Sequence, residues 1–162
     1  FDEDLARNQD DEFNYRLLKN NFKIYLSKKI ISSYYVRASF KNLFRQYFQY
    51  GFWKVYVNKK HRTITTLRQL IPSLMVSTLI LGFVFSFLNM FFALLFATEI
   101  ILYLIGSCWF ASKKANNLKQ LFAIIFTFLI LHTSYGIGYL YGVLKFIFFK
   151  RNPTEKNQQL TR

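Results

Sequence analysis

Residues 70–111 have the sequence LIPSLMVSTLILGFVFSFLNMFFALLFATEIILYLIGSCWFA, and this stretch decides the fold of the chain. It carries a single charged side chain, Glu99. A transmembrane helix needs about 20 apolar residues, because each residue advances it by roughly 1.5 Å through a hydrocarbon core of about 30 Å. The stretch is too long for one span and suits two, with a tight turn at Asn89, shortly after Ser86. The sequence therefore predicts a transmembrane hairpin over 69–111.

A second apolar stretch follows at 121–149, in which the ionisable side chains are His132 and Lys145. As a helix it would be about 44 Å long, which is more than one perpendicular span requires. Its centre is polar and glycine-rich, with the sequence HTSYGIGYLYG over 132–142. The segment either crosses once with a tilt or bends there and returns. We expect the re-entrant form, because it keeps every basic cluster on one side of the membrane.

The charge of the chain is strongly basic, with a formal net charge of +14 from 22 Lys and Arg against 8 Asp and Glu. The excess lies beside the apolar stretches, in residues 13–68, in the link at 112–120 and in the tail at 150–162. Basic residues next to spans mark the cytoplasmic side and attract anionic headgroups, so the membrane is the expected partner and nucleic acid is not. The single Cys108 excludes an intramolecular disulfide, and we expect it as a small buried residue.

The first 68 residues are mixed and charged. Apolar spacing predicts a helix over 10–20, with Asp10 as its N-cap. Alternating and β-branched residues predict extended pieces over 22–27 and 30–36. A longer helix is expected over 39–58, because a broad aromatic stripe is interspersed there with Lys and Arg. Such a helix suits the membrane interface, although an amphipathic helix packed on a domain would show the same pattern.

Acidic residues gather at one place, in RNQDDEFNYRLL over residues 7–18. Asp10, Asp11 and Glu12 are adjacent at the expected helix start, where each acid is favoured by about 0.3–1 kcal/mol through the helix dipole. Successive residues are turned by about 100° on a helix, so at most two of the three can face a single site.

This acidic stretch, followed by FRQYFQYGFWK at 44–54 and by two apolar blocks, resembles the family 2 glycosyltransferases. More specifically, it is similar to the membrane-anchored bacterial enzymes of exopolysaccharide assembly, the succinoglycan-type group. The family's acidic motif corresponds to Gln9–Phe13 in this chain. The resemblance implies that Asp10 is the general base of an inverting transfer. Glu12 would contact the acceptor or orient the site, and Asp11 is expected to be a structural acid at the helix start.

Processive members of the family carry Gln-x-x-Arg-Trp, and the matching stretch here is Gln46 to Tyr50. Gln49 stands in place of the Arg and Tyr50 in place of the Trp, which favours transfer of single sugars, because an amide cannot supply a bidentate charge. Arg37 or Arg45 could provide the missing cation, or both could meet lipid phosphates. The resemblance thus gives the expected donor or acceptor contacts as Glu12, Gln46, Gln49, Tyr50, Arg37 and Arg45.

The expected fold class is mainly α: the remnant of a GT-A type α/β catalytic domain, an amphipathic interface helix and α-helical transmembrane segments. The expected parts are a catalytic-domain remnant (1–38), an interfacial helix and linker (39–68), the hairpin (69–111), a cytoplasmic loop (112–120), a transmembrane or re-entrant segment (121–149) and a polar tail (150–162).

By resemblance, the nucleotide-binding half precedes this chain, and it would hold Mg or Mn through an Asp-x-Asp motif, with no metal residue here. We expect the chain to be an inactive C-terminal fragment of a bacterial inner-membrane enzyme with a cytoplasmic catalytic side. Its partners would be a nucleotide sugar, a polyprenyl-linked or polysaccharide acceptor, and lipids. The competing hypothesis is a small non-enzymatic membrane protein, a scaffold or transporter subunit, with a basic cytoplasmic arm.

Overall fold

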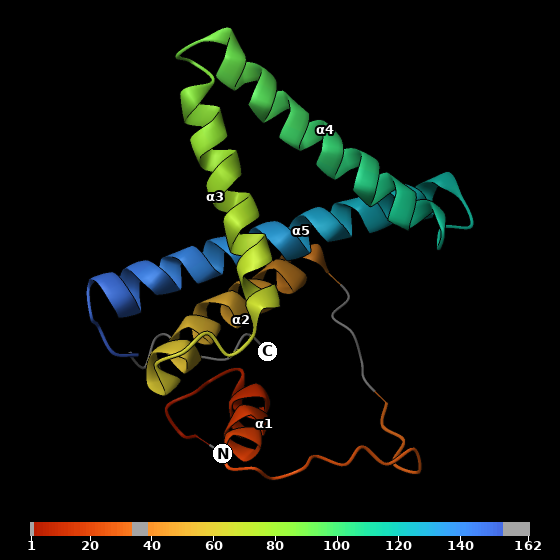
Figure 1. The fold of residues 1–162 in the computed structure, drawn as a ribbon. Helices are drawn as coiled ribbons and strands as arrows, with labels where there is room; N and C mark the ends of the chain where they lie inside the picture. The colour runs from red at the N-terminus through yellow and green to blue at the C-terminus, as the bar shows by residue number, and fades with distance from the viewer. Residues whose placement is uncertain (1, 34–38, 154–162) are drawn as a thin grey trace.

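The fold is helical, as the sequence predicts, in a computed structural model that describes residues 2–33 and 39–153 (Figure 1). Its elements, in chain order, are α1 (Gln9–Lys19), α2 (Phe40–His61), the short 3-10 helix η1 (Leu67–Gln69), α3 (Leu70–Phe85), α4 (Met90–Ser112), α5 (Leu118–Gly142) and the π-helical segment η2 (Val143–Phe148).

The connection between α1 and α2 contains no strand in its described residues, so the extended pieces expected there do not form a sheet. Tyr25, Leu26 and Ile31 are 88%, 92% and 91% exposed. A strand needs a neighbour for its backbone groups and a surface for its apolar face, and this segment has neither in the described structure. The last part of the second expected piece, residues 34–36, lies outside the described residues.

Helix α2 begins where the sequence predicts and continues to His61, three residues beyond the expected end. The Ser39 hydroxyl accepts a hydrogen bond from the Asn42 backbone N–H at 3.2 Å, which satisfies one of the free donors at the helix start. The helix ends at Arg62, whose φ of 54° is left-handed and breaks the helical path.

Helices α3 and α4 form the predicted hairpin, and Asn89 lies in its turn (Figure 1). The Asn89 side chain accepts hydrogen bonds from the N–H groups of Phe91 and Phe92 at 3.0 and 3.3 Å, so it starts α4 as an N-cap. Between the two helices, Thr78 donates a hydrogen bond to Glu99 at 2.5 Å. The single acid of the apolar stretch is therefore satisfied within the hairpin.

Helix α5 is continuous through the glycine-rich stretch, so the expected bend at 132–142 is wrong. The glycines serve close packing instead. A Cβ atom on Gly136 would overlap the carbonyl oxygen of Pro72 in α3, and one on Gly138 would overlap the carbonyl oxygen of Phe48 in α2. The two glycines lie about 200° apart around α5, and small residues at each contact face of a membrane helix let neighbouring backbones approach in this way.

The core lies where α2 crosses the second half of α5. Trp53, Val57 and Phe146 are completely buried there, and Phe52 and Tyr139 are nearly so. Leu5, from the segment before α1, is 1% exposed in the same cluster. This packing joins the acidic N-terminal region to the helices that follow.

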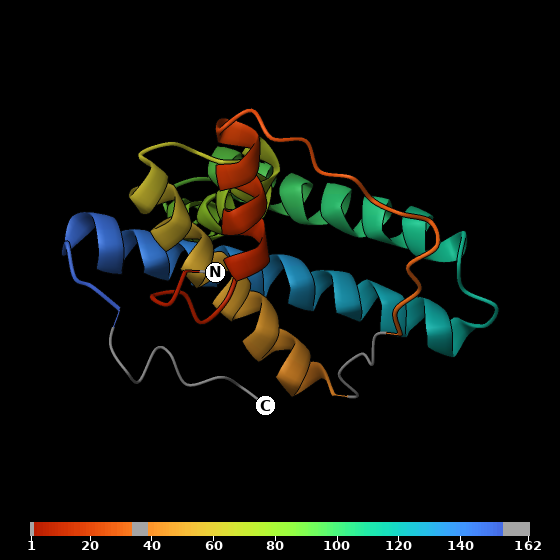
Figure 2. The ribbon, with the colours of Figure 1, turned by 90° about the horizontal axis from the view of Figure 1, so that it is seen from below.

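Within the described residues, three helical segments are long and apolar enough to cross a membrane: Leu67–Phe85, Met90–Ser112 and Leu118–Phe148. Figures 1 and 2 show α5 running across one end of the α3–α4 hairpin, on the side where α3 begins and α4 ends. Cys108, expected to be buried, is exposed on α4. Its neighbours Ser107 and Ala111 take the packed face of the helix, and Cys108 lies beside that face.

Candidate functional site

Helix α1 turns one face toward α2, and that face carries part of the acidic stretch. The side-chain amide of Asn8 donates a hydrogen bond to the Tyr50 carbonyl oxygen at 3.0 Å. One turn further on, Asp11 forms an ion pair with Lys54. Positions 8 and 11 are three residues apart, so they share a face of the helix, as do Tyr50 and Lys54 at a spacing of four on α2. The two helices are thereby held in a defined register.

Glu12 lies on the same side of α1 and is buried, with 2% of its surface exposed. Its two carboxylate oxygens contact His61 Nε2 at 3.0 Å and Arg16 Nη2 at 3.3 Å. The Tyr15 ring packs edge-on against the His61 ring at 4.8 Å between centroids. The expected acceptor contact of Glu12 is not tested by this geometry, but its carboxylate is already engaged in holding α1 against the end of α2.

Asp10 points away from this face. Its neighbour Asp11 is turned by about 100°, and Asp10 is exposed. Within the described part of the chain it has no ion pair, in contrast to Asp11 and Glu12. The predicted N-cap role is wrong, because α1 begins one residue earlier and Asn8, at φ 62°, occupies the cap position. Asp10 instead lies in the first turn of α1, where the helix dipole stabilises its negative charge.

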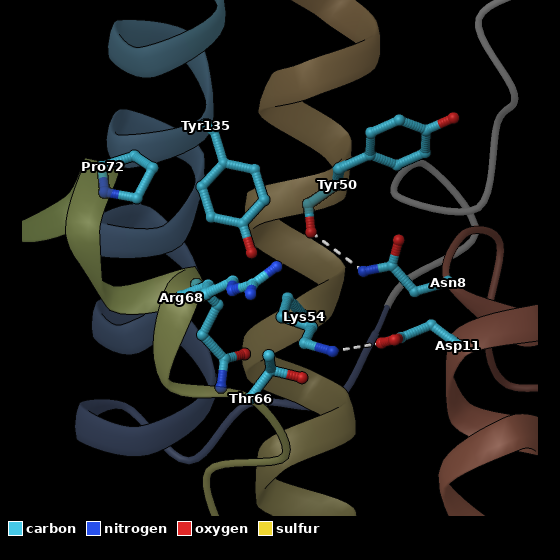
Figure 3. A pocket seen from close by; sticks show the side chains of 9 residues that line it. Asn8, Asp11, Tyr50, Lys54, Thr66, Arg68, Pro72 and Tyr135 are labelled. Carbon is cyan, nitrogen blue, oxygen red and sulfur yellow. Dashed lines mark hydrogen bonds and ion pairs between the residues drawn. The ribbon is translucent and has the colours of Figure 1, made fainter.

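An open cavity of about 390 Å³ lies beside the Asp11–Lys54 pair (Figure 3). Its walls come from α1, α2, α5, η1 and the start of α3. The lining residues are Asn8, Asp11, Tyr50, Lys54, Thr66, Arg68, Gln69, Pro72 and Tyr135. In Figure 3 the Arg68 side chain and the Tyr135 hydroxyl point toward each other across the space between α3 and α5.

The segment Gln46 to Tyr50 contributes Tyr50 to this cavity. Gln46 is buried and donates a hydrogen bond to the Tyr50 hydroxyl at 2.7 Å. The side-chain oxygen of Gln49 accepts a hydrogen bond from Arg7 Nε at 3.1 Å. Both amides thus organise the α2 surface in this structure.

The cations of the cavity are Lys54 and Arg68, which the sequence analysis did not single out. Of the two arginines considered there, Arg45 is exposed on α2 and is not among the lining residues, and Arg37 lies outside the described residues. Two signals could have found the observed pair. Lys54 follows Tyr50 by one helical turn, and Arg68 lies two residues before the apolar run at 70–111.

A second set of intramembrane polar groups serves helix packing. His132 Nδ1 of α5 lies 3.1 Å from the Tyr103 hydroxyl of α4. His132 is therefore hydrogen-bonded between two membrane helices, as polar side chains in such segments commonly are.

The described residues contain no group of three or more His, Cys, Asp or Glu side chains that could hold a metal ion. The adjacent acids of α1 do not make such a site, because Asp11 and Glu12 contact different side chains of α2, Lys54 and His61, and line different hollows. The residues present therefore do not fit a divalent cation.

Comparison with known proteins identifies relatives in glycan biosynthesis. The chain is 30% identical over 146 residues to the succinoglycan biosynthesis protein ExoA of Rhizobium meliloti (strain 1021). The match covers 90% of this chain and 43% of ExoA. A 51-residue region, 32% of this chain and 16% of the relative, is 47% identical to a protein of Methanococcus voltae. That protein is a dolichyl N-acetyl-alpha-D-glucosaminyl phosphate 3-beta-D-2,3-diacetamido-2,3-dideoxy-beta-D-glucuronosyltransferase.

These relatives confirm the resemblance found in the sequence motifs. The chain spans less than half the length of the curated relatives it matches. No protein-family model and no solved structure matches it.

Proposed function

We propose that this chain is the membrane-anchored part of a glycosyltransferase of polysaccharide biosynthesis. The enzyme moves a sugar from a nucleotide-sugar donor to a polyprenyl-linked or growing glycan acceptor. Two facts support the proposal: the similarity to ExoA over 90% of the chain, and the relatives' length, which leaves room for a nucleotide-binding domain outside these residues. The membrane would be a bacterial inner membrane, with α1 on its cytoplasmic side.

One structural observation carries the proposal furthest. The acidic helix α1 is held by Asp11 and Asn8 beside a cavity that is also lined by η1 and by the start of the first apolar helix. An acceptor on a lipid carrier presents its sugar just outside the hydrocarbon, next to its phosphate. A catalytic helix held at the membrane surface would therefore lie at the depth of the acceptor hydroxyl.

Within α1, we assign the general base to Asp10. Asp11 and Glu12 are engaged by Lys54 and by His61 with Arg16, whereas Asp10 has no ion pair within the described residues. Its carboxylate would take the proton from the acceptor hydroxyl as the oxygen bonds to the anomeric carbon. The bond from that carbon to the donor phosphate breaks, the nucleoside diphosphate leaves with the electron pair, and the configuration inverts in a single displacement.

The remaining roles follow from position. Tyr50 lines the cavity and is proposed to contact the acceptor, with Gln46 holding its hydroxyl in place. By resemblance to the family, a divalent cation for the donor diphosphate would be held in the nucleotide-binding half of the enzyme. The chain alone is expected to transfer no sugar.

Substitution of Asp10 in the full-length enzyme tests this function. Asp10→Asn keeps the size of the side chain and removes its basicity, so we expect transfer from nucleotide sugars to fall by at least about a hundredfold. Membrane insertion and donor binding should be retained. Near-normal turnover by this variant would refute the general-base assignment. A full-length protein that transfers no sugar from any donor would favour the competing hypothesis, a scaffold or transporter subunit.

A further inference from the structure

Gln69, one of the residues that line the cavity beside the Asp11–Lys54 pair, carries a buried hydrogen-bond donor without an acceptor. Gln69 is 6% exposed, and its side-chain nitrogen is buried without a partner among the described residues. The orientation of this amide is fixed by its neighbour. The Asn58 side-chain oxygen accepts from the N–H and the hydroxyl of Thr65, so its nitrogen faces Gln69 and donates to the Gln69 oxygen at 3.0 Å. The Gln69 nitrogen therefore remains as a donor.

Two cations border the same cavity. The Lys54 side chain is 7% exposed, and Arg68 extends from the start of the first apolar helix (Figure 3). The one carboxylate among the lining residues is Asp11, which is paired with Lys54. The lining thus has one more positive than negative charge, in addition to the unpaired amide. This chemistry suits an anion with several acceptor oxygens.

The position of the cavity indicates which anion reaches it. Arg68 and Gln69 are the second and third residues of the candidate span Leu67–Phe85. Cations at the start of a span lie at the level of lipid headgroups. A phosphoryl group carried on an isoprenoid chain would lie at the same level, with its chain continuing along the apolar surface of α3 and α5.

We propose that this cavity binds the phosphoryl or diphosphoryl group of a polyprenyl-linked acceptor. Lys54, Arg68 and the Gln69 amide nitrogen donate to its oxygens. Asp11 is the resident counter-ion of Lys54, and the phosphoryl group replaces it when the acceptor binds. The inference rests on the proposed function in naming the lipid-linked acceptor, but the binding itself requires no sugar transfer.

Direct binding to the purified chain in phosphatidylcholine nanodiscs tests the site without any sugar donor. Farnesyl diphosphate should bind, whereas farnesol, which lacks the phosphates, should not. UDP and inorganic pyrophosphate should bind at least about tenfold more weakly, because they lack the chain. Equal binding of UDP and farnesyl diphosphate would overturn the lipid assignment in favour of the nucleotide, and equal binding of farnesol would overturn the phosphoryl site.

Substitutions show whether the anion occupies this cavity. Arg68→Gln and Gln69→Leu should each weaken the binding of farnesyl diphosphate by about ten- to a hundredfold. This is the range expected for the loss of a hydrogen bond to a charged group. Lys59→Gln removes a cation of α2 that does not line the cavity and should leave the affinity unchanged. Asp11→Asn should tighten binding, because it removes the competing carboxylate.

The chain is so basic that a diffuse attraction for anions must be distinguished from a site. Equal weakening by Arg68→Gln and Lys59→Gln would show diffuse attraction and overturn the proposal. Weaker binding by Asp11→Asn would contradict the counter-ion role. Arg68 is exposed, so its substitution does not depend on tolerance of the packed core. A positive result here with inactive full-length enzyme would refute the proposed transfer reaction and leave the binding site intact.

Discussion

Gly51 of α2 lies directly against the carbonyl oxygen of Tyr135 in α5. A Cβ atom at Gly51 would overlap that oxygen and would lie 2.9 Å from the backbone nitrogen of Tyr139. Gly138 makes the reciprocal approach from α5 to Phe48. The two helices therefore meet backbone to backbone, and this crossing places Tyr135 and Tyr50 on the same cavity.

Gly51→Ala should destabilise the protein, because the contact is backbone and cannot rotate away. Overpacking of this kind costs about 1–3 kcal/mol. We expect a lower midpoint of thermal unfolding in detergent and greater exposure of Trp53 to a fluorescence quencher. Gly106→Ala is the matched control, since a Cβ there meets nothing within 4 Å. Equal stability of the two variants would show that α2 and α5 do not cross at Gly51.

Glu12→Ala should release α1 from α2. The substitution removes the partner of the half-buried His61 and of Arg16, and such losses cost about 1–3 kcal/mol. Hydrogen exchange of the α1 amides should become roughly ten times faster or more. Asp10→Asn, at an exposed position of the same turn, should change exchange little and abolish transfer in the full-length enzyme. Unchanged exchange in Glu12→Ala would contradict a docking role.

Much of the fold is predictable because its signals are local. The α3–α4 hairpin follows from apolar length and from Asn89, and the start of α2 follows from Ser39. The continuity of α5 is not predictable in this way. Glycines and polar residues at 132–142 favour a bend when considered alone, and only their contacts with Pro72 and Phe48 show that they serve packing.

The candidate site, like the fold, is only partly predictable from the sequence. The acidic stretch is visible in the sequence, and so is the restriction that its three acids cannot share one direction. Which acid faces α2 depends on where α1 begins, and a shift of one residue turns each side chain by about 100°. Lys54 and Arg68 join the site through tertiary contacts between segments that are distant in sequence, so their local sequence positions do not show that the two cations border one cavity.

The contact of Lys60 with Asp2 should make attachment of the N-terminal segment depend on pH. Burial acts to raise the pKa of Asp2. Hydrogen bonds from Lys60 and from the Asp4 backbone, together with the positive charges of Lys60 and Arg16, outweigh burial and leave the pKa of Asp2 below its ordinary value of 3.8. The hydrogen bond to Asp2 raises the pKa of Lys60 above 10.5.

The stabilisation from Asp2 is present above pH 3.8 and is lost as the pH falls through the lowered pKa. The stabilisation from Lys60 is present below pH 10.5 and is lost as the pH rises through the raised pKa. The attachment of the N-terminal segment to α2 should thus be constant from about pH 5 to 9. Lys60→Gln should weaken it by at most about 1 kcal/mol, because Lys60 is partly solvated. Limited proteolysis across pH measures this, and a Lys60→Gln profile identical to wild type would refute the contact.

The two ends of α5 should lie on the same side of the membrane. The helix begins at Leu118, just after the end of α4, and Gly136 already packs against Pro72 near the start of α3. Because α3 and α4 are antiparallel, these two points belong to one end of the hairpin. About 27 Å of α5 therefore runs across that end without crossing to the other. The basic residues near 113 and 150 then share one side, in agreement with the positive-inside rule.

Labelling of single cysteines tests this arrangement in sealed vesicles of both orientations. In a Cys108→Ser background, Ala115→Cys and Asn152→Cys should react with an impermeant maleimide from the same side. Leu88→Cys, in the turn of the hairpin, should react from the opposite side. If Asn152→Cys reacted from the same side as Leu88→Cys, α5 would have to cross the membrane. The cavity lined by Arg68 would then lose its proposed place at the headgroup level, because Tyr135 would lie near the middle of a span.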